Sequence, residues 1–398
     1  MKKLLSLVLA LCLVLSVVAF AQADEPVTIR LFRATYNTGM VDEDEVKAVQ
    51  DAINARLAEL GAGVRVEIHD IFNSEYGDKA NMALIGNEVD LLWTANWWST
   101  IGTNDLYKNN GAYDLTNLLP GTVLWDSMPE WYWEAARYDG KDLFVPVYKE
   151  GAEGYMIKIL DSNAEAIGTT GAEIVAAVEA AEGTIAKLRA MEPFLEKATY
   201  LKYPFSLGGA YYFRFGLDSF DFIDNALFSM IGADQKTGEL VNPIQTPQYL
   251  EYLTMISEWA QKGYFNVDDE LTGAVPATMS QTQDWLAGWW TAVPNNKESE
   301  GRDGNQAESF VAITSNYGRS GTTLGSCFAV NAACSEEVAK ACVEYLGLLF
   351  TDNTIANLYT YGIEGKDYIL TNGKVDRTAE NGLSATYNHS PWESTSVK

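Results

Sequence analysis

Three apolar segments decide the fold: Val27-Thr-Ile-Arg-Leu-Phe32, Val64-Arg-Val-Glu-Ile68 and Val89-Asp-Leu-Leu-Trp93. Each has the length and residue types of a β-strand. Between the first two, residues 44–60 place apolar side chains at steps of three and four, which predicts an amphipathic helix that ends at Gly61. A further helical stretch covers residues 79–85. This alternation predicts a parallel sheet with right-handed crossovers.

Polar and aromatic residues follow two of these strands. In open sheets of this kind, ligands bind beyond the carboxyl ends of the strands. Ala34-Thr-Tyr-Asn-Thr-Gly39 follows the first strand and Thr94-Ala-Asn-Trp-Trp98 follows the third. We therefore expect the ligand to contact Tyr36, Asn37, Asn96, Trp97 and Trp98.

The tryptophans are the most informative residue type. Of the 11 in the chain, several are adjacent or clustered: Trp97 with Trp98, Trp131 with Trp133, and Trp285 with Trp289 and Trp290. Sugar rings present flat C–H faces that pack on aromatic planes, and their hydroxyls need a few directed polar partners. Asn96 beside the first pair and Asp284 before the last group fit this description. The alternative is that these rings only pack in the core or at a hinge.

Length and charge limit the class of protein. The chain has 398 residues, which exceeds the usual limit of about 250–300 for a single core, so we expect two lobes. Its formal net charge of −26 would repel nucleic acid and anionic lipid, which argues against both as partners. The charge also keeps a chain soluble.

Cysteine and histidine are too sparse for several kinds of catalytic or metal site. After residue 23 the only cysteines are Cys327, Cys334 and Cys342, so one internal disulfide is the maximum, and buried thiols are the preferred interpretation. His69 and His389 are the only histidines. No glycine-rich phosphate loop opens a helix. We expect no metal and no cofactor.

The first residues predict export. Lys2 and Lys3 precede an apolar run from Leu4 to Phe20, and Ala21-Gln-Ala23 supplies a small-residue cleavage site. Residues 1–23 are therefore expected to be a signal peptide, and the protein to act in the periplasm or at the cell surface. Cys12 lies inside the apolar run, so a lipid anchor is the weaker alternative.

Four segments follow the order and spacing of a known family. They are Asn87-Glu-Val-Asp-Leu-Leu-Trp93, Ala136-Arg-Tyr-Asp-Gly-Lys-Asp-Leu-Phe-Val-Pro-Val-Tyr-Lys-Glu150, Gly325-Ser-Cys-Phe-Ala-Val-Asn-Ala332 and Tyr361-Gly-Ile-Glu-Gly-Lys-Asp-Tyr368. Here the chain resembles family 1 of the extracellular solute-binding proteins, the maltose-binding type, and particularly its sugar-importer branch. The likeness covers most of residues 27–370, although residues 161–183 depart from the family pattern.

The resemblance implies an α/β, two-lobed periplasmic-binding-protein fold of type II. Each lobe is expected to hold a mostly parallel sheet flanked by helices, and hinge strands to join the lobes. Residues 24–147 and about 320–350 would form the first lobe, and residues 148–319 and about 351–398 the second. Such proteins close around their ligand by domain rotation.

The resemblance also suggests ligand contacts outside the first three strands. Glu150 aligns with a hinge carboxylate that bonds sugar hydroxyls, with Lys149 beside it, and Trp289 and Trp290 fall where second-lobe aromatic rings stack on sugar. Tyr211 and Arg319 are further candidates. The alternatives are an ion pair of Glu150 with Lys149 or Arg137, and core packing of Tyr211.

Together these features predict a monomeric, non-enzymatic protein that captures a sugar or oligosaccharide and delivers it to the permease of an ABC transporter. The same cleft could instead bind a polyamine or quaternary ammonium by cation–π contact. A secreted glycoside hydrolase is a third possibility, because acidic residues are abundant enough for a catalytic pair.

Overall fold

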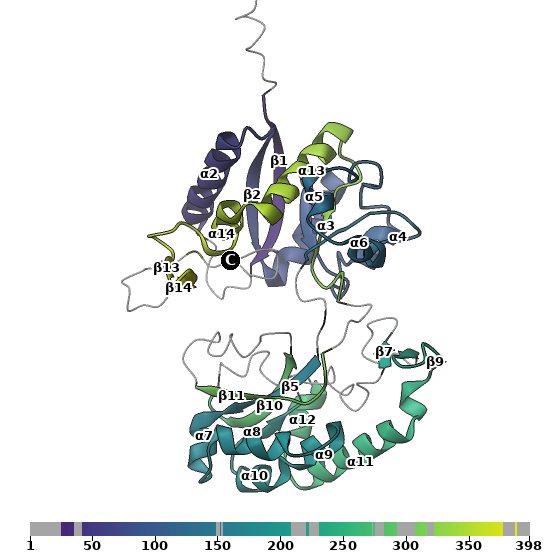
Figure 1. The fold of residues 1–398 in the computed structure, drawn as a ribbon, viewed down its shortest axis with the longest axis vertical. Helices are drawn as coiled ribbons and strands as arrows, with labels where there is room; N and C mark the ends of the chain where they lie inside the picture. The colour runs from purple at the N-terminus through teal and green to yellow at the C-terminus, as the bar shows by residue number, and fades with distance from the viewer. Residues whose placement is uncertain are drawn as a thin grey trace, which may run out of the picture. The chain divides into compact units, whose positions relative to one another are not determined.

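The computed structural model describes residues 25–35, 42–148, 152, 154–207, 220–222, 231–272, 274, 282–292, 307–316, 322–376 and 387. The chain forms two compact units, Met1–Val147 with Ser326–Lys398, and Tyr148–Gly325 (Figure 1). Within the described residues, no helix is both long and apolar enough to cross a bilayer.

The first unit contains one five-stranded sheet, a small hairpin and the helices that cover them. Its strands are β1 (Val27–Thr35), β2 (Val64–Phe72), β3 (Leu91–Thr94), β4 (Val145–Pro146), β12 (Cys327–Val330), β13 (Ile369–Thr371) and β14 (Lys374–Asp376). Its helices are α2 (Glu43–Glu59), α3 (Asn73–Gly86), α4 (Thr103–Lys108), α5 (Val123–Asp126), α6 (Glu130–Ala136), α13 (Glu336–Thr351) and α14 (Asn353–Tyr361).

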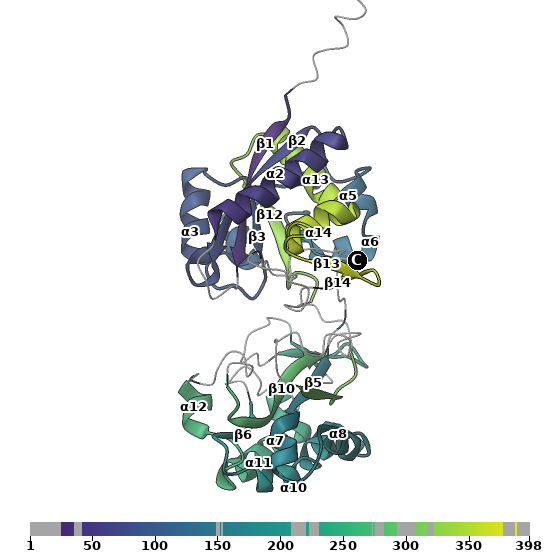
Figure 2. The ribbon, with the colours of Figure 1, turned by 90° about the vertical axis from the view of Figure 1, so that its left-hand side faces the viewer.

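The predicted parallel start of the sheet is confirmed, because β1 pairs in parallel with both β2 and β3. Helix α2 begins at the N-cap Asp42, whose side chain accepts from backbone N–H groups of the first turn, and buries Val46, Val49, Ile53 and Leu57. Helices α3 and α13–α14 lie on opposite sides of the sheet (Figure 2). The predicted amphipathic helix is therefore confirmed, and it packs on the sheet.

Strand β12 completes the sheet from the far end of the sequence. The strand order is β2-β1-β3-β12-β4, and β12 runs antiparallel to both of its neighbours. Cys327 pairs with Thr94 on one side and with Pro146 on the other. This arrangement puts the carboxyl ends of β3 and β4 at the same edge of the sheet.

Residues 351–376 and 387 lie in the first unit, whereas the family resemblance had implied the second lobe. Helix α14 packs on α2 and α13. The buried Arg33 of β1 donates to the carbonyl of Tyr359 at 3.0 Å and to the hydroxyl of Tyr387 at 2.8 Å. Its guanidinium also pairs with Asp70 of β2 at 2.6 Å and lies 4.5 Å from the Tyr359 ring centre. These contacts hold the C-terminal segment on the first sheet.

The second unit contains a four-stranded sheet, a small three-stranded sheet and a helical layer. Its strands are β5 (Gly154–Leu160), β6 (Tyr203–Ser206), β7 (Phe220–Phe222), β8 (Gly232–Asp234), β9 (Leu240–Val241), β10 (Trp285–Ala292) and β11 (Glu308–Ala312). Its helices are α7 (Asp161–Ala166), α8 (Gly171–Glu179), α9 (Thr184–Arg189), α10 (Glu192–Lys197), η2 (Pro243–Gln245), α11 (Pro247–Gln261) and α12 (Val267–Thr272).

The larger sheet of this unit has the order β11-β5-β10-β6 and is mixed, not mostly parallel as expected. Strand β5 is antiparallel to both β10 and β11, and only β10 and β6 are parallel. That expectation came from the family resemblance, whereas the pairing of this sheet joins segments that are distant in the sequence. Residues of β5 and β10 form one apolar core with helices α7–α11, including Ile157, Ile174 and Trp259.

The buried Arg33–Asp70 pair gives a test of what holds the first unit together. We expect Arg33→Met to lower the free energy of unfolding by about 3–5 kcal/mol, because the Asp70 carboxylate would stay buried without the guanidinium. Adding Asp70→Leu should restore a large part of the loss. Urea unfolding followed by tryptophan fluorescence measures both. Lys47→Met, which removes an exposed pair with Asp51, is the matched control. Equal effects of Arg33→Met and Lys47→Met would refute this role.

Candidate functional site

The candidate site in the first unit lies at the carboxyl edge of its sheet. The loop after β1, with Tyr36 and Asn37, is outside the described residues. The loop after β3 is described and carries Asn96, Trp97 and Trp98. Asn96 and Trp98 are half-buried, and Trp97 is 50% exposed.

The rings of this loop form one aromatic cluster on a buried base. Trp97 and Trp98 are stacked, with ring centroids 5.1 Å apart and an interplanar angle of 24°. Beneath them, the buried Trp93 meets Trp98 edge-on at 5.2 Å and Trp97 at 6.0 Å. Tyr76 of α3 packs against Trp98 at 5.4 Å. The cluster therefore offers a supported aromatic surface with Trp97 outermost.

Hydrogen bonds fix this loop to the sheet. The indole N–H of Trp93 donates to Ser326 Oγ at 2.8 Å, and the Tyr76 hydroxyl donates to the Trp93 carbonyl at 2.7 Å. The Thr94 hydroxyl closes the loop by donating to the carbonyl of Ile101 at 2.5 Å. At Gly102 a Cβ atom would lie 2.2 Å from the Trp98 carbonyl oxygen, so the turn requires glycine there. The loop is preorganised, which reduces the entropy lost on binding.

In the second unit the two predicted tryptophans of β10 have different environments. Trp289 is only 5% exposed and meets Phe205 edge-on at 5.8 Å in the helix-covered core. Its contact with a sugar stays a prediction. Adjacent strand residues point to opposite faces of a sheet, so only one of the pair can enter this core. Trp290 is half-buried, with the ammonium of Lys158 4.5 Å from its ring centre.

Sequence reasoning missed the buried ion pair beside Trp290. Lys158 of β5 is 1% exposed, and its ammonium lies 3.4 Å from a carboxylate oxygen of Glu308 on β11. The signal was a single lysine inside the apolar segment Gly154–Leu160, where an unpaired charge would be too costly. Both side chains are buried, so they hold β5 and β11 together.

Lys149, Glu150, Tyr211 and Arg319 lie outside the described residues. Arg137, the suggested alternative partner of Glu150, pairs with Asp142 at 2.9 Å. Among the residues that the structure describes, no three histidine, cysteine or acidic side chains gather as a metal site.

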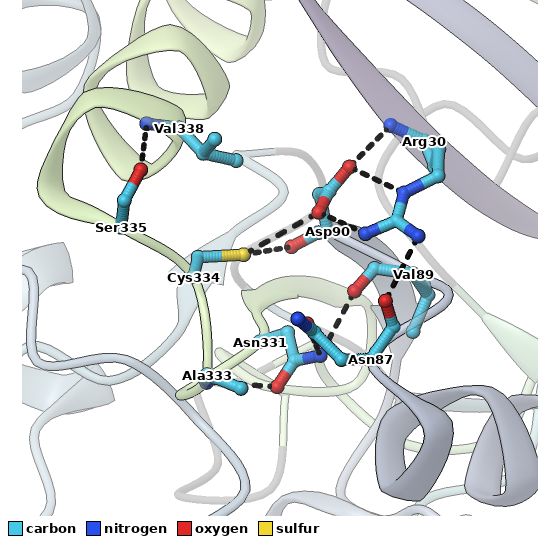
Figure 3. A network of polar contacts seen from close by, with 9 residues as sticks. All are labelled: Arg30, Asn87, Val89, Asp90, Asn331, Ala333, Cys334, Ser335 and Val338. Carbon is cyan, nitrogen blue, oxygen red and sulfur yellow. Dashed lines mark hydrogen bonds and ion pairs between the residues drawn. The ribbon is translucent and has the colours of Figure 1, made fainter.

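A polar network occupies the opposite edge of the first sheet (Figure 3). Arg30 donates to both carboxylate oxygens of Asp90, at 2.9 and 2.7 Å, and to the carbonyl of Asn87 at 2.8 Å. Asn331 donates to the Val89 carbonyl at 2.9 Å. The thiol of Cys334 lies 3.6 Å from Asp90 Oδ1. The network ties β1 and β3 to the turn before α13.

All three described cysteines are thiols with reduced acidity. Burial raises the pKa of Cys327 and Cys342, and burial together with the Asp90 carboxylate raises the pKa of Cys334 to about 12. Only thiolates react readily, so a raised pKa lowers the reactivity of these thiols. Cys327 and Cys342 are buried, as expected of small core side chains, whereas Cys334 is half-buried.

Comparison with known proteins then identifies the fold. No protein-family model matches the sequence. A carbohydrate ABC transporter substrate-binding protein of Streptococcus pneumoniae serotype 4 is 22% identical over 331 residues. These residues make up 81% of this chain but only 62% of the relative's length.

Solved structures of the N-glycan transport solute-binding protein NgtS from Streptococcus pneumoniae match over nearly the whole chain. One has a TM-score of 0.73 at 19% identity and covers 93% of this chain and 77% of NgtS. The fold is that of the solute-binding proteins. The complex of NgtS with Man5GlcNAc gives a TM-score of 0.64 at 20% identity, with the same coverage of both chains. The expected α/β solute-binding fold is therefore confirmed.

Replacing the buried Trp93 should destabilise the fold far more than replacing the exposed Trp97. Trp93→Ala should lower the free energy of unfolding by about 3–5 kcal/mol, because it leaves a cavity under the loop. Trp97→Ala should change it by less than about 1 kcal/mol, since exposed side chains contribute little. Urea unfolding of both variants measures this difference. Equal losses of unfolding free energy in the two variants would contradict a supporting role for Trp93 beneath an exposed Trp97.

The Arg30–Asp90 pair predicts a pH dependence of stability. Burial alone would raise the pKa of Asp90, but hydrogen bonds from Arg30 outweigh it and hold the pKa below its ordinary value. The pair therefore stabilises the fold above the unfolded pKa of about 3.9, and this contribution is lost as the pH falls through the folded value. We expect Asp90→Asn to cost about 2 kcal/mol at neutral pH.

Urea unfolding at a series of pH values tests this expectation. The difference between wild type and Asp90→Asn should shrink steadily once the pH is below about 3.9. Asp51→Asn, which alters an exposed pair on α2, serves as the control. If the difference in unfolding free energy between wild type and Asp90→Asn does not change with pH, Asp90 is not stabilised as a carboxylate by Arg30.

Proposed function

We propose that this chain is an exported solute-binding protein that captures a carbohydrate and delivers it to the permease of an ABC transporter. The observation that carries the proposal is the supported aromatic surface of Trp97 and Trp98 at the carboxyl edge of the first sheet. Flat C–H faces of sugars pack on such rings.

The comparisons support the carbohydrate class. The relative from Streptococcus pneumoniae is a carbohydrate ABC transporter substrate-binding protein, and NgtS binds Man1GlcNAc and Man5GlcNAc in its solved complexes. The apolar run Leu4–Phe20 with its cleavage site supports export. In this proposal the ligand is bound and released unchanged, because the matched proteins act as binding proteins.

Thermal unfolding with a ligand panel tests the proposal. The panel holds Man1GlcNAc, Man5GlcNAc, xylo-oligosaccharides, malto-oligosaccharides, spermidine and glycine betaine. A ligand at about 100 times its dissociation constant stabilises the folded state by about 2.7 kcal/mol, which raises the melting temperature by a few degrees. We expect a shift with at least one sugar series, and its loss in Trp97→Ala.

The control for this experiment is Tyr200→Ala, which removes an exposed ring in the second unit. It should leave the sugar-induced shift unchanged. A shift with spermidine or betaine alone would replace the carbohydrate by a cation held by cation–π contact. No shift with any sugar at millimolar concentration would refute carbohydrate capture.

A release assay tests whether the bound sugar is left intact. We expect no release of nitrophenol from nitrophenyl glycosides of the sugars that the panel identifies, over many hours at micromolar protein. Steady release that Trp97→Ala reduces would show a glycoside hydrolase instead.

A further inference from the structure

Helix α3 carries a buried glycine where it meets the Trp97–Trp98 loop. Gly77 lies inside this helix, which runs from Asn73 to Gly86. Glycine destabilises a helix interior relative to alanine, because it has more backbone freedom to lose on folding. The neighbours of Gly77 explain why alanine, the better helix former, does not fit at this position.

The loop fills the space that a side chain at position 77 would take. A Cβ atom there would lie 2.5 Å from Thr100 Oγ1 and 3.2 Å from both Thr100 Cβ and the indole nitrogen of Trp98. Non-bonded carbon atoms prefer separations of about 3.5–4.0 Å, so all three contacts would be too short. The absent side chain therefore lets the Trp98 ring lie directly against α3.

Tyr76 holds the same loop with its ring and its hydroxyl. The ring lies 5.4 Å from the Trp98 ring at an interplanar angle of 58°. The hydroxyl donates to the Trp93 carbonyl at 2.7 Å and lies 3.1 Å from the carbonyl oxygen of Phe32. Phe32 is in β1 and Trp93 is in β3. One buried side chain thus connects Trp98 to the strand that carries the loop and to the neighbouring strand.

Trp98 in turn determines where the exposed ring of the cluster lies. Trp97 stacks on it, with ring centroids 5.1 Å apart and an interplanar angle of 24°. A shift of the Trp98 ring therefore changes the position of the Trp97 ring. Binding groups keep a productive geometry only when the residues that support them are themselves fixed by packing and hydrogen bonds.

We propose that Tyr76 and Gly77 are positioning residues of the sugar site: they fix the Trp98 indole, and through it the plane of the Trp97 ring on which the sugar packs. The inference rests on the proposed carbohydrate function and deepens it. Both residues are buried, so they act on sugar affinity without contacting the ligand.

Alanine at position 77 tests this role, because its methyl group must displace Thr100 or the Trp98 ring. Gly86→Ala is the matched control: it makes the same change in the same helix, and its Cβ would come no closer than 3.4 Å to the exposed Glu88 side chain. Calorimetric titration with Man5GlcNAc, xylohexaose and maltohexaose measures sugar affinity. We expect Gly77→Ala to weaken binding at least about fivefold and Gly86→Ala less than about twofold, because small misplacements of binding groups have large effects.

Two further variants examine the contacts one by one. Tyr76→Phe keeps the ring and removes the hydroxyl that bonds the Trp93 carbonyl, and it should weaken sugar binding several-fold. Adding Thr100→Ala to Gly77→Ala removes the hydroxyl that the new methyl group would meet at 2.5 Å, and it should restore part of the affinity.

Circular dichroism distinguishes a moved ring from a general loss of stability. Stacked indoles give an exciton signal, and Trp97→Ala defines the contribution of this pair. We expect Gly77→Ala to reduce that contribution and Gly86→Ala to leave it unchanged. Melting temperatures of the unliganded variants close to that of the wild type show that each variant folds.

Weaker sugar binding together with a reduced exciton signal in Gly77→Ala supports the positioning role. Unchanged binding in Gly77→Ala, or an equal loss in Gly86→Ala, overturns the role while the carbohydrate function stands. Weaker binding with an unchanged exciton signal also overturns it, because the ring pair has then not moved. A wild-type protein that binds none of the three sugars removes the role together with the proposed function.

Discussion

The antiparallel strand Cys327–Val330 is the constraint on which the first unit depends. Because it inserts between β3 and β4, both of those strands gain ladder hydrogen bonds from a segment more than 170 residues further along the chain. The insertion also brings Ser326 under Trp93 and thereby fixes the base of the aromatic cluster. Pairing in the sheet and the shape of the candidate site are therefore consequences of the same strand.

Each unit contains a buried ion pair that joins separate strands. Arg33 and Asp70 connect β1 to β2 and also hold Tyr359 and Tyr387, while Lys158 and Glu308 connect β5 to β11. Burying charges costs several kcal/mol per ion unless the partner and further hydrogen bonds compensate. The guanidinium of Arg33 donates to the Asp70 carboxylate, the Tyr359 carbonyl and the Tyr387 hydroxyl, which compensates for its burial. The last two bonds hold the C-terminal segment on the first unit.

The aromatic residues illustrate how far residue type alone can indicate a site. Clustered tryptophans were expected to stack on a sugar, and Trp97 has an exposed ring in a loop that turns sharply at Gly102. The Trp289 ring is buried, because strand alternation sends it into a core that helices cover. Trp131 carried the same signal as the other clustered rings, but only the burial of Tyr132 and Trp133 reveals that it points outward.

The sequence by itself determined the local features: the first strands and helices, their parallel order, and the position of the Trp97–Trp98 loop at a carboxyl edge. These follow from apolar periodicity and the handedness of crossovers, which act over short stretches of chain. Only the tertiary structure decided the mixed second sheet, the unit that holds residues 351–376 and 387, and which tryptophans are exposed. Those depend on contacts between distant segments, such as Arg33 with Tyr387, which no local pattern encodes.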